Sequence, residues 1–397
     1  MKKLFLLAFC ALTTSVFAQT TEPKEQNEEG FVFTTVKENP ITSIKDQNRS
    51  STCWSFSALG FLEAELLRMG KGEYDFSEMY LVHHTMLDRA EMYVRLHGEG
   101  SFSPGGSFYD LVYCFNHYGL VPQEAMPGIR YGEPLPVHNE LDAVAGAYVN
   151  AIAKGNHKKL TPVWKEGLSA IYDTYLGECP ETFTYNGKEY TPRTFADELG
   201  VNIDDYVSLT SYTHHPFYTT FAIEIPDNWH WSLSYNLPIE ELMQVMHNAI
   251  DKGYTFAWAS DVSESGFSRN GVAVMPDDAK AAELSGSDMA RWTGMKPEDK
   301  RAELTAKPLP EMEITQEMRQ VAFDNWETTD DHGMVIYGIA KDQNGKPYFM
   351  VKNSWGTEGK YNGIWYASEA FVAYKTMSIM VHKDALPKDI KKKLGIK

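Results

Sequence analysis

The hydrophobic period changes along the chain, and this change restricts the fold more than any other feature of the sequence. In the first half, apolar residues recur at three- and four-residue steps, which predicts helices at residues 53–69 and 77–96 and a third that ends at Gly119. Beyond Gly253, short β-branched and aromatic runs are separated by Gly, Asn and Asp, the pattern of strands joined by hairpins. We therefore predict an α+β fold with a helical N-terminal half and an antiparallel β-rich C-terminal half.

The segment between these halves, about residues 140–250, is mixed in character. Helical runs are predicted in it at 141–152, 163–176, 194–199 and 239–252. We interpret this segment as a large, mostly helical insertion within one domain that covers residues 31–397.

The N-terminus, MKKLFLLAFCALTTSVFAQ, combines two lysines, a short apolar run and small residues that end at Ala18. This pattern predicts a signal peptide at residues 1–18, followed by a flexible lead-in at 19–30. The apolar run is too short to span a bilayer comfortably, and no later segment is long and apolar enough to replace it. We expect an exported protein, periplasmic or secreted, without stable membrane insertion.

Charge and cysteine content exclude several classes of protein. The chain has 37 Lys and Arg against 54 Asp and Glu, a formal net charge of −17, so we expect no nucleic-acid partner. Cleavage near Ala18 would leave Cys53, Cys114 and Cys179, an odd number that requires at least one free thiol in an exported chain. Their spacing is not that of a zinc site.

Several histidines are candidates for metal ligands. His83-His84, His214-His215 and His230 lack the helix-spaced partner and acidic neighbour that such motifs carry. We expect these histidines to be exposed or satisfied by protein partners, and we expect no metal or organic cofactor.

One set of residues has the properties of a catalytic site. Cys53 begins a predicted helix, and a helix N-terminus together with a neighbouring imidazolium favours the reactive thiolate. His332 opens one predicted strand and Asn353 ends the next, so an antiparallel hairpin would bring the two side chains together and let the amide orient the ring. Gln47 precedes the helix, where its amide could join the Cys53 N–H in stabilising an oxyanion.

These stretches resemble the papain-like cysteine peptidases. QNRSSTCWSFSALGFLEAE is similar to that family around its nucleophile, and KNSWGTEGKYNGIWY around its orienting asparagine. The resemblance implies that Cys53 is the nucleophile, His332 the base and acid, Asn353 the orienting group and Gln47 the oxyanion donor. It further implies that Trp355 shields Asn353, and that Gly105 and Gly106 let a peptide substrate lie close along the cleft.

Two differences from typical papain-like enzymes point to one branch of the family. His332 follows Cys53 by 279 residues, whereas about 130–150 is usual in papain-like enzymes, and little sequence precedes the catalytic stretch. Both features resemble the bleomycin hydrolase and aminopeptidase C branch, whose members form hexameric cages with a C-terminal arm in each cleft. The resemblance implies an aminopeptidase of this type, acting on peptide substrates, and a possible homohexamer.

The C-terminal segment leaves alternatives open. The sequence ends at Lys397, where a further arm is expected from the branch, so either the Lys397 carboxylate positions substrate amines or the enzyme is a less strict aminopeptidase. The alternatives are a papain-like endopeptidase with an unblocked cleft, a catalytically silent peptide-binding relative, and a relative that transfers the acyl group to an amine.

Overall fold

The computed structural model describes residues 30–277, 296, 302 and 304–397. The predicted signal peptide and nearly all of the predicted lead-in lie outside the described residues. No helix in the described ranges is long and apolar enough to cross a membrane.

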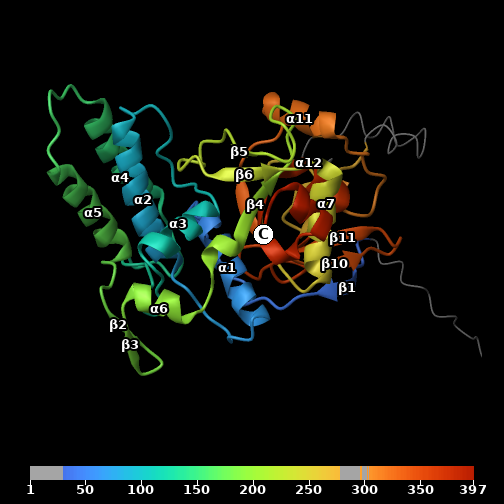
Figure 1. Cartoon of the computed structure of the whole chain (residues 1–397), viewed down its shortest axis with the longest axis horizontal. Helices are drawn as coiled ribbons and strands as arrows, with labels where there is room; N and C mark the ends of the chain where they lie inside the picture. Colours follow the sequence, from blue (N-terminus) through green and yellow to red (C-terminus); the bar gives the residue numbers. More distant parts are fainter. Residues whose placement is uncertain (1–29, 278–295, 297–301, 303) are drawn as a thin grey trace, which may run out of the picture.

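Helices dominate the first half of the chain, as predicted. Within the described residues the α-helices are α1 Cys53–Arg68, α2 Glu78–Arg95, α3 Tyr109–His117, α4 Asn139–Lys154, α5 Val163–Leu176, α6 Pro192–Glu198, α7 Ile239–Asp251, α11 Gln316–Asp324, α12 Glu369–Lys375 and α13 Lys388–Lys393. Ser77 caps α2 by accepting a hydrogen bond from the Tyr80 N–H, as its position in the sequence favours. Figure 1 shows α2, α4 and α5 side by side at one end of the molecule.

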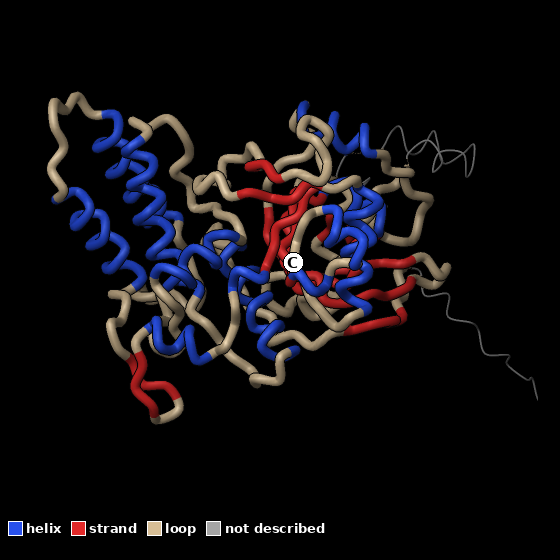
Figure 2. The backbone as a smooth tube through the Cα atoms, in the orientation of Figure 1, coloured by secondary structure: helices blue, strands red, loops and turns tan. Residues whose placement is uncertain are grey.

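The strands gather in one large sheet at the other end of the molecule (Figure 2). They are β1 Thr34–Glu38, β4 Tyr206–Thr210, β5 Thr220–Ala222, β6 Leu233–Asn236, β7 Phe256–Ser260, β8 Phe267–Ser268, β9 Val272–Ala273, β10 His332–Lys341, β11 Pro347–Lys352, β12 Ile364–Ser368 and β13 Thr376–His382. Their order is β5-β6-β4-β13-β7-β10-β11-β12-β9-β8, with β1 pairing with β10. A separate hairpin joins β2 Phe183–Tyr185 to β3 Lys188–Tyr190.

Strand β10 separates two hydrophobic cores, because successive side chains of a strand point to opposite faces. Val335 belongs to the core formed by α1 to α6, whereas Met334 and Ile336 belong to the core formed by α7, α12 and α13. Helix α1 packs on β10 from the first side. The N-terminus of α1 and the start of β10 therefore approach one another between the helical half and the sheet.

The predicted insertion at 140–250 contains both helices and strands in the described structure. Helices α4, α5 and α6 fill its first part, but residues 206–236 contribute three strands, β4, β5 and β6, to the main sheet. Strand β4 pairs with β13 near the C-terminus. The aromatic segment before α7 has strand-like composition, but only pairing with β13, distant in sequence, makes it part of the sheet.

Candidate active site

Cys53 is the first residue of α1, as the sequence predicts. The N-cap position is occupied by Thr52, whose side chain makes no capping hydrogen bond, so it does not compete with the sulfur for the Trp54 N–H. Cys53 is half-buried, and Cys114 is buried. Both are free thiols, together with Cys179, which agrees with the predicted excess of unpaired cysteines.

Gly333 brings the histidine strand against this helix end. A Cβ atom at position 333 would lie 2.6 Å from Ser57 Oγ and 3.1 Å from the Phe108 ring, so only glycine fits between the strand and α1. The Gly333 backbone also acts on the thiol, because it lowers the pKa of Cys53 in the way that a hydrogen bond to the sulfur does. Because Gly333 directly follows His332, this close approach brings the imidazole into the neighbourhood of the thiol.

His332 and Asn353 meet as the predicted hairpin requires. Strands β10 and β11 pair antiparallel, and His332 Nε2 lies 2.7 Å from Asn353 Oδ1. The same Oδ1 accepts a hydrogen bond from the Ser354 N–H at 2.8 Å, which identifies it as the amide oxygen. His332 Nε2 must then carry the proton in this bond, and the neutral ring keeps Nδ1 as its basic nitrogen. The amide thus fixes both the orientation and the tautomer of the ring.

Trp355 lies over His332. Its ring centroid is 4.8 Å from that of His332, with an angle of 31° between the planes. Trp355 thus lies against the imidazole that Asn353 orients, and its predicted roles in shielding Asn353 and lining the cleft stay predictions. An indole against His332 excludes water from one face of the ring and stabilises an imidazolium through its π-face.

Gln47 is buried and its amide is held in one orientation. The Ser354 hydroxyl donates to Gln47 Oε1 at 2.7 Å, and the Gln47 N–H donates to the Ser354 carbonyl at 2.8 Å. With its oxygen occupied, the amide presents its NH₂ group in the other direction. Gln47 is thereby held as a hydrogen-bond donor, the property required of the predicted oxyanion site.

The predicted cleft glycines lie beside the nucleophile helix. A Cβ at Gly106 would lie 2.7 Å from the Trp54 ring, and Trp54 Nε1 donates to the Pro104 carbonyl at 3.0 Å. A Cβ at Gly105 would lie 2.1 Å from a carboxylate oxygen of Asp227. The segment that contains both glycines is therefore held against the residue after Cys53, and larger side chains would not fit there.

Burial, not the helix end, dominates the electrostatics of the thiol and the imidazole. Burial raises the pKa of Cys53 to about 12, against hydrogen bonds from the Gly333 and Trp54 backbone that lower it. Burial also lowers the pKa of His332 to about 4, against the bond to Asn353 that raises it. Each group therefore resists ionising alone. Transfer of the thiol proton to the imidazole is favoured over ionisation of either group alone, because the two opposite charges then compensate one another.

Two carboxylates near the thiol were not found from the sequence. The charges of Asp330 and Asp227 both raise the pKa of Cys53. Burial, and secondarily the charge of Asp227, raises the pKa of Asp330 to about 8. Asp330 is visible in the sequence as one of two acidic residues before His332, but Asp227 comes from the loop between β5 and β6 and reaches the site only through folding.

A buried ionic network behind the site was also missed. Lys352 Nζ donates to Thr42 Oγ1 at 2.7 Å, and Thr42 Oγ1 donates to Glu63 Oε2 at 2.6 Å. Lys45 lies 3.5 Å from Glu63 and 2.6 Å from Glu78. Because Lys352 precedes Asn353 and Glu63 lies on α1, the network fixes the asparagine strand relative to the nucleophile helix. A charged residue in a predicted strand or helix carries no local sequence signal that its side chain is buried, so the sequence did not reveal this network.

This fold and this arrangement of thiol, imidazole and amide define the class of papain-like cysteine peptidases. Sequence models agree: the Peptidase C1-like family matches residues 99–277 and 311–396, and the Papain family cysteine protease model matches residues 32–90. The chain belongs to the Peptidase C1-like family.

Individual relatives cover most of the chain at low identity. Aminopeptidase G of Lactobacillus delbrueckii subsp. lactis is 23% identical over 90% of this chain and 84% of its own length. Aminopeptidase C of Streptococcus thermophilus is 22% identical over 93% and 85%. The crystal structure of PepW from Lactobacillus rhamnosis superposes with a TM-score of 0.68, at 20% identity, over 91% of this chain and 84% of that one. At this identity the structural similarity establishes the fold alone.

Proposed function

We propose that this protein is a cysteine aminopeptidase, which releases residues from the free N-termini of peptides through a thioester intermediate. The observation that carries the proposal is the bond of 2.7 Å between His332 Nε2 and Asn353 Oδ1, formed beside the helix end that begins with Cys53. It leaves Nδ1 as the only ring nitrogen that can exchange a proton with the thiol.

In the proposed reaction, the Cys53 proton passes to His332 Nδ1 as the sulfur bonds to the scissile carbonyl carbon. The Cys53 N–H and the Gln47 amide stabilise the oxyanion that forms. The intermediate then collapses, the C–N bond breaks, and the imidazolium gives its proton to the leaving amine. A water molecule deprotonated by His332 attacks the thioester, the C–S bond breaks, and the thiol is restored as the acid product leaves.

Specificity for a free N-terminus is supported by two carboxylates and by the names of the relatives. Asp227 lies against Gly105 of the cleft and pairs with the fully buried Arg89 at 3.1 Å. Asp330 precedes the catalytic histidine, and no hydrogen bond to its carboxylate is recorded among the described residues. We assign to Asp330, assisted by Asp227, the recognition of the substrate ammonium group, because the bound cation favours the ionised carboxylate over its protonated form and pairs with it in the cleft.

The C-terminal residues make their recorded contacts elsewhere. In the described structure, α13 lies on the α7 side of the sheet, where Ile396 packs into the core and Lys393 lies 2.7 Å from Glu241. Helix α1, with Cys53, lies on the opposite face. The proposal therefore places the ammonium group against Asp330 and not against the Lys397 carboxylate, which was one of the two alternatives that the sequence left open.

A pair of fluorogenic dipeptide amides, one with a free and one with an acetylated N-terminus, tests this proposal. We expect the free-amine substrate to be cleaved at least about 10²-fold faster in kcat/KM, as for a charged group paired in a buried site. Asp330→Asn should reduce this ratio mainly through KM, while Asp384→Asn, a matched carboxylate in the C-terminal segment, should not change it. Equal rates on the two substrates would instead support the endopeptidase alternative.

A truncation distinguishes Asp330 from the C-terminus as the group that binds the substrate ammonium. Removal of residues 394–397 should leave the ratio of free-amine to acetylated cleavage unchanged if Asp330 holds the ammonium group. A ratio that collapses on truncation but survives Asp330→Asn would assign the role to the C-terminus.

Export and assembly are further parts of this proposal. The lysine-led apolar N-terminus supports export to the periplasm or the medium, and detection of the mature N-terminus near Ala18 in a cell fraction would test it. Resemblance to the bleomycin hydrolase branch supports a homohexamer. A solution mass by light scattering decides this, because a monomer would contradict the cage.

A further inference from the structure

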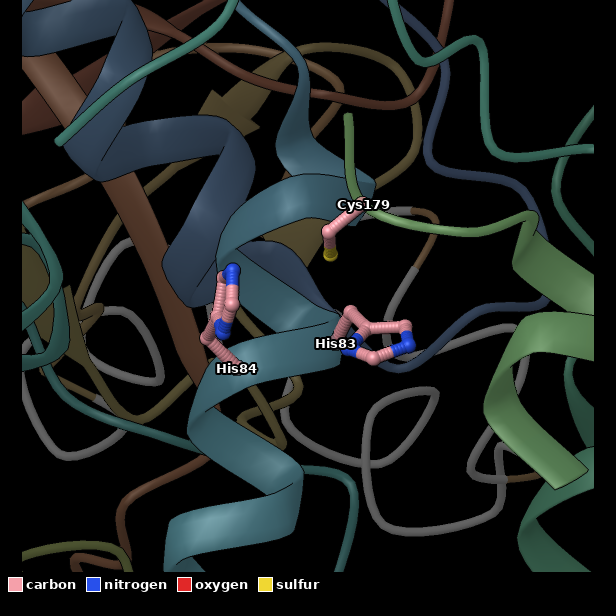
Figure 3. A group of neighbouring side chains, drawn as sticks. All are labelled: His83, His84 and Cys179. Carbon is pink, nitrogen blue, oxygen red and sulfur yellow. The ribbon is translucent and has the colours of Figure 1, made fainter. Parts of the chain in front are cut away.

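A second cluster of sulfur and imidazole lies in the helical half, away from the catalytic residues. His83 and His84 stand side by side on α2, and Cys179 comes from the loop after α5 (Figure 3). Each residue offers one ligand atom, and these atoms all lie within 4.8 Å of one another. In Figure 3 the sulfur points between the two rings.

Two of the imidazole nitrogens lack partners although they are buried. His83 is 3% exposed, and its Nε2 lies 2.7 Å from Asp173 Oδ1 on α5. Its other nitrogen, Nδ1, and His84 Nε2 are buried without a hydrogen-bond partner among the described residues. A buried polar atom left unpaired costs about 1–3 kcal/mol, so two at one place indicate a missing ligand.

The rings are held rigidly for such a role. His84 stacks on Tyr118 with centroids 3.9 Å apart and planes at 10°, and it meets the edge of Tyr80 at 4.6 Å. The Asp173 carboxylate fixes the orientation of His83 and stabilises the tautomer with the proton on Nε2, which leaves the lone pair on Nδ1. A carboxylate behind a ligating histidine is the usual outer support of a bound metal.

The chemistry of the three side chains also suits a cation. A neutral imidazole offers a lone pair to a metal, and a bound cation would compensate the charge of the thiolate that it creates.

We propose that His83 Nδ1, His84 Nε2 and Cys179 Sγ bind a Zn²⁺ ion, with Asp173 supporting His83 and water in the fourth position. Two nitrogen donors and one thiolate are a preferred ligand set of this metal. The thiol proton is released to solvent as the Zn–S bond forms. Bond lengths in tetrahedral zinc sites imply ligand separations of roughly 3.5 Å, so the cluster has to contract by about 1 Å.

The sequence argued against this site because no acidic neighbour or further ligand lies close to His83 in the chain, but folding brings distant residues to it. The acidic neighbour and the third ligand that appeared to be absent come from Asp173 and Cys179, about ninety residues after His83. The other histidines considered as ligands have protein partners, as predicted: His230 pairs with Asp110 at 2.7 Å. The exposed rings of His214 and His215 both lie within 3.0 Å of the carboxylate of Glu224.

The bound ion would link α5 and the loop after it, both in the predicted insertion, to α2, the helix that contacts the cleft segment. Cys179 and Asp173 belong to α5 and the loop after it, whereas α2 also carries Arg89, which donates to the Gly105 carbonyl. A metal that bridges α2 and α5 would therefore stabilise the helical half by mass action and raise its unfolding temperature.

The test uses the Cys53→Ala protein, because Cys53 and His332 also form a sulfur and nitrogen pair that could take up zinc. After treatment with a chelator, Zn²⁺ is titrated by calorimetry, and Co²⁺ is added as a spectroscopic probe of thiolate ligation. We expect one Zn²⁺ per chain, a thiolate-to-cobalt charge-transfer band, and a higher unfolding temperature with metal. No stoichiometric uptake would overturn the proposal.

Single substitutions in the same background locate the ion. Cys179→Ser should abolish the charge-transfer band, and Asp173→Asn should weaken Zn²⁺ binding about 10–100-fold, the usual effect of an outer partner. His215→Gln, in the exposed cluster, should change neither. Asp173→Asn and His84→Gln keep the comparison decisive if Cys179→Ser folds poorly. Binding that survives all three but disappears in His215→Gln would place the metal at the exposed cluster and contradict the proposal.

Discussion

The molecule contains two sets of sulfur and imidazole, and they differ in what holds the imidazole. At the active site, the neutral amide of Asn353 accepts from His332 Nε2, and the thiol begins a helix. In the helical half, the carboxylate of Asp173 holds His83, and the thiol of Cys179 lies in a loop with two imidazoles beside it. A neutral partner lets one ring gain and lose a proton during a reaction, whereas a carboxylate and a second imidazole favour a stationary cation.

The largest expected difference between the two thiols is in turnover. Cys53→Ala should lower kcat/KM by at least about 10³-fold, because it removes the nucleophile. Cys179→Ser should leave kcat/KM within a few-fold when the protein is assayed at a temperature where it is folded. Steady-state kinetics with thermal unfolding curves measures both. Substantial hydrolysis by Cys53→Ala would show that the thiol is not the nucleophile.

Exchanging the partner of the imidazole tests the comparison directly. Asn353→Ala should lower kcat/KM by about 10²-fold, since a misoriented ring loses most general acid–base catalysis. Asn353→Asp gives His332 the carboxylate partner that His83 has. A carboxylate raises the pKa of the imidazolium, so the loss of activity on raising the pH should move to higher pH. An unchanged alkaline limb would mean that residue 353 does not control His332.

A smaller effect is expected where the strand meets the nucleophile helix. Gly333→Ala should lower the free energy of unfolding by about 1–3 kcal/mol and reduce activity, because its Cβ would lie 2.6 Å from Ser57 Oγ. Gly146→Ala, on α4 with open space around it, should be neutral or stabilising. Adding Ser57→Ala to Gly333→Ala should recover part of the loss. A fully stable Gly333→Ala protein would contradict the close approach.

The smallest expected effect is on the pH dependence of alkylation. Asp330 is ionised only above its raised pKa of about 8, and its charge then raises the pKa of Cys53. Asp330→Asn removes that charge, so iodoacetamide should react with Cys53 at lower pH in the variant, by less than about one pH unit. Below pH 8 the two profiles should coincide. A shift toward higher pH would have the wrong sign for this charge.

Most of the elements around the active site were predictable, because the signals for each helix and hairpin lie close together in the sequence. The period of the apolar residues gave α1, α2 and α5 nearly to the residue, and the hairpin between β10 and β11 placed His332 against Asn353. The approach of that hairpin to α1 was inferred from family resemblance. The structure adds the physical condition for it, which is the missing side chain at Gly333.

The sequence by itself determined the helical and strand-rich halves, the helix that begins with Cys53, and the pairing of His332 with Asn353. Only the tertiary structure decided that residues 206–236 join the sheet, that Asp227 lies beside Gly105, and that Cys179 and Asp173 meet His83. The physical reason is that hydrophobic period and turn signals act within about twenty residues, whereas burial and charge depend on which distant segments pack together. The same packing sets the pKa values of Cys53 and His332, which no local motif contains.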